Sequence, residues 1–161
     1  MFYEVPTHYF LCAGAAEGYA PLNAFDQALL AAGIGDVNLV RLSSILPPGA
    51  RQVEPFQPPG GALVPTAYSR MISSQPGEVI SAAVAVAIAE DPRLPGVIME
   101  HHGAQPLEVV LAQVQEMARR AMVERDRSIL EIQTSGTEHE VNEHGAAFAG
   151  VVLWNGDGRA R

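Results

Sequence analysis

Two adjacent serines, Ser43 and Ser44, lie in the segment VNLVRLSSILPPGA, where an apolar stretch meets two prolines. One hydroxyl would suffice to close a turn by bonding a nearby backbone group. The pair also permits self-cleavage: the Ser44 hydroxyl attacks the Ser43 carbonyl, the ester eliminates, and residue 44 becomes a dehydroalanine that hydrolyses to a pyruvoyl group. That step needs a closely held peptide and donors for the oxyanion. A second pair, Ser73 and Ser74, shows that the dipeptide alone does not decide between a turn and cleavage.

Two carboxylates could take part in chemistry of this kind. Glu100 follows the apolar run GVIM, so its side chain is expected to be at least partly buried. Burial raises the pKa of a carboxyl group, which can then carry a proton at neutral pH. Asp26 lies three residues after Asn23, a suitable N-cap, and its simplest role is a first-turn acid favoured by the helix dipole. Taken singly, both residues leave a purely structural role open.

The histidines are candidates for a metal site, but their spacing does not predict one. His139 and His144 are five residues apart, whereas two ligands on one helical face are four apart. His101 and His102 would point to opposite faces of a strand. The sequence also lacks the P-loop, dinucleotide-binding, nucleophile-elbow and Cys-x-x-Cys motifs. We therefore expect solvated, partly paired histidines, no metal and no nucleotide cofactor.

Composition narrows the class of protein. A length of 161 residues suits one domain with a substantial core. A formal charge of −8 argues against a nucleic-acid partner. No apolar run approaches the roughly 18 residues of a membrane span, which predicts no membrane partner. The single cysteine, Cys12, excludes an internal disulfide and fits a reducing cytoplasm.

The elements that must position these residues follow from apolar periodicity and turn residues. Amphipathic or buried helices are predicted over Asn23–Gly33, Gly77–Asp91 and Gln105–Asp126. Stretches rich in Val, Ile, Leu and aromatic residues predict strands over Tyr9–Gly14, Val37–Ser43, Ala62–Ile72, Gly96–His101, Ser128–Glu140 and Ala146–Trp154. Strands outnumber helices and the connections are short, which predicts an α+β layered sandwich.

Three long stretches together resemble the pyruvoyl-dependent arginine decarboxylases. They are EGYAPLNAFDQALLAAGIGDVNLVRLSSILPPGA, GALVPTAYSRMISSQPGEVISAAVAVAIAED and GVIMEHHG, and the similarity runs from about Tyr9 to Trp154. The resemblance implies a single domain over residues 1–161 with a four-layer αββα sandwich. It also implies a homotrimer of self-cleaved protomers. Cleavage between Ser43 and Ser44 would give a β chain of residues 1–43 and an α chain of residues 44–161, with a covalent pyruvoyl group at position 44.

The resemblance also implies roles for individual residues. The reaction would be decarboxylation of L-arginine to agmatine and CO₂ through a Schiff base to the pyruvoyl group derived from Ser44. Glu100 would donate the proton, Asp26 would meet the guanidinium, and Asn38 would bond the oxyanion during processing. Another cationic amino acid as substrate, and an unprocessed relative that only binds ligands, are the alternatives. The stretch AGAAEG and the histidines after Glu100 depart from the family pattern.

Strand geometry indicates that the site is shared between protomers. Asn38 and Ser44 are six residues apart, which is roughly 20 Å at about 3.3 Å per residue. The residues between them, LVRLS, include no Gly or Pro to favour a reversal. We therefore expect Asn38 of one protomer to serve Ser44 of its neighbour, with Asp26 on the side of Asn38 and Glu100 on the side of the pyruvoyl group.

Overall fold

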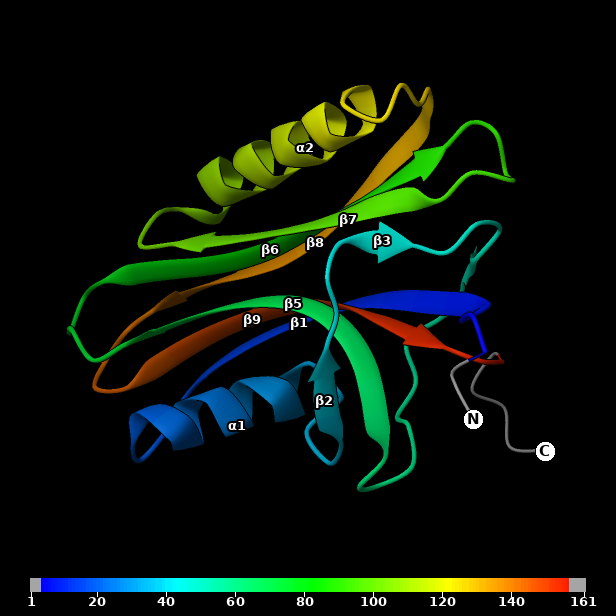
Figure 1. The fold of residues 1–161 in the computed structure, drawn as a ribbon. Helices are drawn as coiled ribbons and strands as arrows, with labels where there is room; N and C mark the ends of the chain where they lie inside the picture. The colour runs from blue at the N-terminus through cyan, green and yellow to red at the C-terminus, as the bar shows by residue number, and fades with distance from the viewer. Residues whose placement is uncertain (1–3, 157–161) are drawn as a thin grey trace.

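The computed structural model describes residues 4–156 as two β-sheets and two helices (Figure 1). The helices are α1 (Pro21–Ala31) and α2 (Leu107–Val123). The strands are β1 (His8–Glu17), β2 (Asn38–Arg41), β3 (Ile45–Leu46), β4 (Arg51–Gln52), β5 (Leu63–Ser73), β6 (Val79–Ala89), β7 (Gly96–Gly103), β8 (Ile129–Glu140) and β9 (Gly145–Trp154). No helix within residues 4–156 is long and apolar enough to cross a membrane.

The two sheets stack face to face, and one helix covers each outer face (Figure 1). The five-stranded sheet has the order β2-β5-β9-β1-β4, and the four-stranded sheet has the order β3-β7-β6-β8. Helix α1 packs on the first sheet and α2 on the second. This arrangement confirms the expected α+β class, the four αββα layers and the single domain.

Three apolar layers hold the sandwich together. The layer between the sheets includes Tyr9, Ile80, Val84 and Ile98, all buried. The second layer joins α1 to the five-stranded sheet, and the third joins α2 to the four-stranded sheet. Because both faces of each sheet are covered, the central strands lose the polar face that most antiparallel sheets show to water.

The helix predicted over residues 77–91 is wrong: the structure has strand β6 there. Its side chains alternate between two layers: Ala83 and Ala85 pack toward α2, whereas Val84 and Val86 pack toward the other sheet. A strand buried on both faces is continuously apolar and cannot be told from a buried helix by composition. Alanine, which favours helices, occupies the α2 side because it lets that helix lie close.

Helix α1 begins earlier than predicted. Its N-cap is Ala20 rather than Asn23, and Pro21 occupies the first turn, where its missing N–H costs nothing. Asp26 therefore lies in the middle of the helix and not in its first turn, so the helix dipole does not account for it. The predicted stop at Gly33 is confirmed, because Gly33 has φ of 79° directly after the C-cap residue Ala32.

Helix α2 agrees with its prediction except at its ends, since it covers Leu107–Val123 with Pro106 as N-cap. The apolar face of this helix is buried at Val110, Val114 and Met122. A backbone N–H in the first turn of α2 is capped by a residue of β8: Glu138 accepts the Leu107 N–H at 2.7 Å. The helix is thereby tied to the sheet that it covers.

Glu17 fastens one end of the sandwich. Its carboxylate accepts the N–H groups of Asn142, Glu143 and His144 at 2.9–3.0 Å, and its Oε1 lies 2.6 Å from Nε2 of His139. Burial raises the pKa of Glu17, but these hydrogen bonds outweigh burial and lower the pKa to about 2. The departing stretch AGAAEG covers the second half of β1 together with Gly18, and its glutamate binds the backbone of the β8–β9 turn.

We expect Glu17→Gln to lower the free energy of unfolding at neutral pH by roughly 1–2 kcal/mol, because a neutral amide oxygen is a weaker acceptor for three N–H groups. The folded-state pKa is depressed, so the advantage of the wild type is complete above the ordinary value of 4.5 and is lost as pH falls toward about 2. Urea denaturation across that window measures both effects. Glu140→Gln, an exposed change on β8, is the control; an equal loss in both variants would contradict the assignment.

Candidate active site

The Ser43–Ser44 peptide lies where the chain passes from one sheet to the other. The strand predicted over residues 37–43 ends at Arg41, and β3 starts at Ile45 in the opposite sheet (Figure 1). On one side the Leu42 N–H donates to Thr66 O of β5 at 3.0 Å. On the other side the Ile98 N–H of β7 donates to Ser44 O at 2.7 Å. The connecting peptides are thus held at both ends.

The two serine pairs differ in what their hydroxyls do. Ser73 bonds Glu78, and Ser74 Oγ lies 2.7 Å from Nδ1 of His144, so this pair belongs to the hydrogen-bonded turn after β5. Among residues 4–156, neither Ser43 Oγ nor Ser44 Oγ makes a protein hydrogen bond. The Ser44 hydroxyl is therefore not engaged by another protein group in the described residues, unlike the hydroxyls of Ser73 and Ser74.

Glu100 lies on β7 beside this crossing. The pairing of Ile45 with Val97, extended by the bond from Ile98 to Ser44, places Glu100 two residues further along the same strand. Its side chain is 19% exposed, Oε1 lies 3.6 Å from Nη2 of Arg41, and Oε2 is buried without a hydrogen-bond partner. Burial raises the pKa of Glu100, although Arg41 opposes the shift. The expected buried carboxyl is found, with one oxygen left for a ligand.

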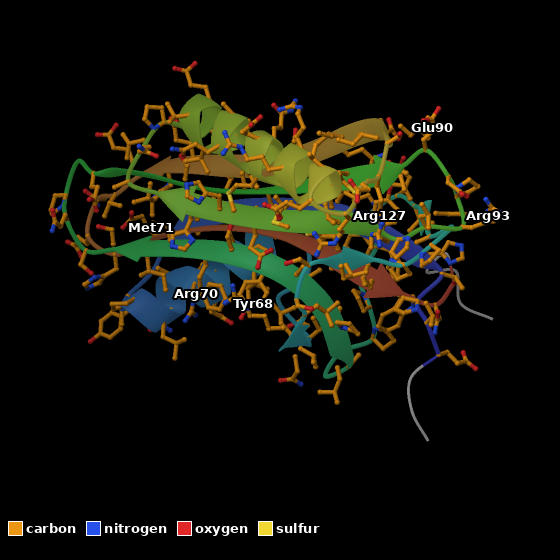
Figure 2. All side chains as sticks on the ribbon, turned by 45° about the horizontal axis from the view of Figure 1, so that its top comes forward. Tyr68, Arg70, Met71, Glu90, Arg93 and Arg127 are labelled. Atoms are coloured by element: carbon orange, nitrogen blue, oxygen red, sulfur yellow. The ribbon has the colours of Figure 1, made fainter. Side chains whose placement is uncertain are left out.

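Arg41 is a site residue that sequence reasoning does not single out. Its guanidinium carbon lies 4.9 Å from the centroid of the Tyr68 ring, and its Nη2 reaches Glu100. Tyr68 and Arg70 project from β5 on the side of α1, where Arg70 lies over Phe25 (Figure 2). One signal was present: Arg41 is the charged residue in the stretch VNLVRLSS, which is otherwise apolar apart from Asn38 and the serines.

Asn38 and Asp26 are not brought to the crossing within one protomer. Asn38 starts β2, where its Nδ2 donates to Gly61 O at 3.1 Å, and its side chain is exposed. Asp26 is exposed on α1, outside the five-stranded sheet. In the described part of the chain neither residue makes an ion pair or side-chain hydrogen bond with Ser44 or Glu100. The chain does not reverse between Asn38 and Ser44; it changes sheets.

His101 and His102 lie on opposite faces of β7, as adjacent residues of a strand do. His101 lies against α2, next to Met117 and Arg120, whereas His102 follows the parity of Glu100 and is exposed. Burial lowers the pKa of His102, and His101 and Arg41 lower it further. Residues 4–156 contain no group of three or more His, Cys, Asp or Glu side chains suited to hold a metal ion.

The edge that carries the crossing also exposes apolar side chains. Val40 of β2, Ile45 of β3 and Leu63 of β5 are all exposed, and β2 and β3 are edge strands of their sheets. Edge strands offer unpaired backbone groups, and apolar side chains beside them favour association. This edge, defined by Val40, Ile45 and Leu63, is called the crossing edge below.

The family model for pyruvoyl-dependent arginine decarboxylase (PvlArgDC) matches residues 8–157. The chain belongs to this family. A pyruvoyl-dependent arginine decarboxylase of Methanocaldococcus jannaschii is 48% identical over 95% of this chain and 93% of its own length. The protein of the same name from Methanococcus maripaludis is 41% identical over 94% and 93%, and that from Thermococcus kodakarensis is 37% identical over 95% and 98%.

A solved pyruvoyl-dependent histidine decarboxylase overlaps 58% of this chain and 51% of its own, with a TM-score of 0.49 and 16% identity, a similarity too partial to bear on function.

Members of the pyruvoyl-dependent arginine decarboxylase family carry a covalent pyruvoyl group, and the residues around the crossing fit one. The Ser44 hydroxyl has no protein partner in residues 4–156, and the Ser44 carbonyl is fixed by Ile98. Glu100 beside it has a buried oxygen with no partner. A buried orphan acceptor is costly unless a ligand or a proton completes it. The site therefore has an anchored backbone, a hydroxyl without a protein partner and an acid two residues along β7 from the Ile98–Ser44 hydrogen bond.

The contrast between the serine pairs predicts where the chain is cut. Purified wild-type protein should run as two chains on a denaturing gel, with masses that match residues 1–43 and residues 44–161. Ser44→Ala should remain one chain, because no hydroxyl is left to attack the Ser43 carbonyl. Ser74→Ala is the matched control and should still be cut, since its hydroxyl is engaged with His144. Intact wild-type protein, or a cut after Ser73, would contradict the assignment.

Proposed function

We propose that this chain cleaves itself between Ser43 and Ser44 and then decarboxylates L-arginine to agmatine and CO₂, with Glu100 as the proton donor. The observation that carries the proposal is the buried carboxyl of Glu100, with one oxygen unpartnered, next to a sheet-crossing peptide whose Ser44 hydroxyl is free. Membership of the family and the names of relatives that this chain covers almost completely favour arginine over other cationic amino acids.

Self-cleavage uses groups of the chain itself. The Ser44 Oγ attacks the Ser43 carbonyl carbon, and collapse of the tetrahedral intermediate breaks the C–N bond and leaves an ester with a free amine at residue 44. Loss of the Cα proton then expels the ester oxygen, which becomes the C-terminal carboxylate of Ser43, and leaves dehydroalanine. Water adds to that residue and ammonia departs, giving the pyruvoyl group. The hydrogen bonds from Leu42 and to Ser44 O hold the segment during these steps.

The residues then divide the work of decarboxylation. The pyruvoyl ketone supplies the electron sink that loss of CO₂ from an α-amino acid requires. Glu100, whose pKa is raised by burial, holds the proton that must reach the substrate's α-carbon. Asp26 pairs with the substrate guanidinium, whose planar fork matches a carboxylate. Asn38 donates to the oxyanion that forms during processing.

A shared site reconciles these roles with the fold. Asn38 and Asp26 lie away from Ser44 in one protomer, so their roles require a second copy that docks along the crossing edge. The exposed Val40, Ile45 and Leu63 would be buried by that docking. We propose a homotrimer of cleaved protomers with one site at each interface. The buried Cys12 thiol, whose pKa burial raises to about 12, fits a protein of the reducing cytoplasm.

Asp26→Asn should weaken the use of arginine and leave self-cleavage intact. Loss of a charge-assisted pair costs roughly 1.5–3 kcal/mol, so kcat/KM should fall roughly 10- to 100-fold, mainly through KM. Steady-state release of CO₂ from labelled arginine measures this. Asp126→Asn is the control: Asp126 is exposed with φ of 52°, a conformation that asparagine adopts readily. Normal arginine kinetics in Asp26→Asn would leave Asp26 without a role in binding.

Complementation tests whether the site is shared. The assay uses arginine well below the raised KM of Asp26→Asn, where processed Asp26→Asn protomers and processed Glu100→Gln protomers are each expected to show low activity. After mild dissociation, mixing and reassembly, some interfaces should pair an intact Asp26 with an intact Glu100, and activity should return. Each variant reassembled with itself is the control and should keep its low activity at that arginine concentration. Mixed trimers verified by native mass spectrometry that show no recovery would place the whole site within one protomer.

A further inference from the structure

The pairing of Glu100 with Arg41 is asymmetric. Nη2 of Arg41 lies 3.6 Å from Oε1, whereas Oε2 is buried and has no partner in the described residues. The two oxygens of a carboxyl group are equivalent in water, but a cation on one side makes them different. A proton on the acid is repelled from Oε1, which faces the guanidinium, and is carried best on Oε2.

Arg41 is the charged group that meets Glu100. On β7 itself, His102 follows on the same face and His101 lies on the α2 face. On β6, the residue opposite Glu100 is the apolar Val84. On β5, the Tyr68 ring lies under the Arg41 guanidinium. The Ser69 hydroxyl lies within hydrogen-bond distance of the carbonyl oxygens of Ala83 and His101 rather than of Glu100.

We propose that Arg41 is a positioning residue for the decarboxylation: stacked on Tyr68, it holds Oε1 of Glu100 so that Oε2 carries the transferable proton. This inference rests on the proposed role of Glu100. Arg41 also stabilises the Glu100 carboxylate that remains after proton transfer. The buried acid can therefore still release its proton. Without that cation, burial alone would bind the proton too firmly.

The strength of the effect follows from exposure. The Arg41 side chain is 59% exposed, so solvent screens its charge, and its removal should move the titration of Glu100 by about one pH unit rather than several. The direction is fixed, because Arg41 lowers the pKa of Glu100 and its loss must raise it. Activity that requires the protonated acid should then persist to higher pH.

The first test needs no pyruvoyl group. In the uncleaved Ser44→Ala chain, the carboxyl titration of Glu100 is followed by infrared difference spectroscopy and assigned by its loss in Ser44→Ala/Glu100→Gln. Adding Arg41→Met should raise the midpoint by about one unit. Arg41→Lys keeps the positive charge and should bring the midpoint most of the way back to the value with Arg41. It also provides a readout if the methionine variant misfolds. Arg51→Met, an exposed arginine on the far edge strand β4, should not shift it. An unmoved midpoint in Arg41→Met would overturn the positioning role.

The second test uses the processed enzyme. Activity is expressed per pyruvoyl group, counted by titration with phenylhydrazine. Arg41→Met should lower kcat about tenfold with little change in KM. The alkaline limb of the pH profile of kcat should move to higher pH by the same interval as the Glu100 midpoint in the first test. Arg41→Lys should return that limb toward the wild-type position. A titration that shifts while the limb stays fixed would remove Glu100 as proton donor and overturn the function proposed for it, although the ion pair would stand. A kcat loss with both midpoints fixed would reduce Arg41 to a structural residue.

Discussion

The hydrogen bond from the Ile98 N–H to Ser44 O is the contact on which the site depends. It brings the chain onto the four-stranded sheet only three residues after β2 has ended on the other sheet. The peptides of Leu42, Ser43 and Ser44 therefore carry the chain from one sheet to the other, with a bend at Ser44 and with Thr66 holding the first end. The same bond aligns β3 with β7, and so puts Glu100 beside the crossing. The Ser43–Ser44 peptide and Glu100 are therefore positioned by one register.

Burial and charge oppose each other at Glu100. The sandwich encloses its carboxyl between the sheets, which favours the protonated form, whereas Arg41 at the open edge favours the ionised form. A carboxyl with neither influence would titrate too low to hold a proton at neutral pH. A carboxyl with burial alone would hold its proton too firmly. At the edge of the two-sheet sandwich, the Glu100 carboxyl is both buried between the sheets and close to the charge of Arg41.

The sequence predicted the α+β class and six of the strands because these depend on local apolar patterns, whereas the four layers followed from the family resemblance. It placed a helix over β6, since an alanine-rich strand buried on both faces has no polar alternation to reveal it. The family resemblance predicts roles for Ser44 and Glu100. The sequence did not predict that the chain changes sheets at Ser43, because two-residue pairings such as β3 with β7 leave no pattern. Arg41 was missed for a similar reason: its partner lies on another sheet.

The position of β1 gives the cut a consequence for folding. Residues 1–43 contain β1, α1 and β2, and β1 lies between β9 and β4, which belong to the other fragment. The proposed cut between Ser43 and Ser44 would therefore yield two polypeptides that remain interleaved through the ladder from His8 to Glu17. Unfolding of the cut protein would then separate two molecules, so refolding would become a bimolecular encounter that depends on concentration. The protein would fold once as a single chain and afterwards persist by the slowness of its dissociation.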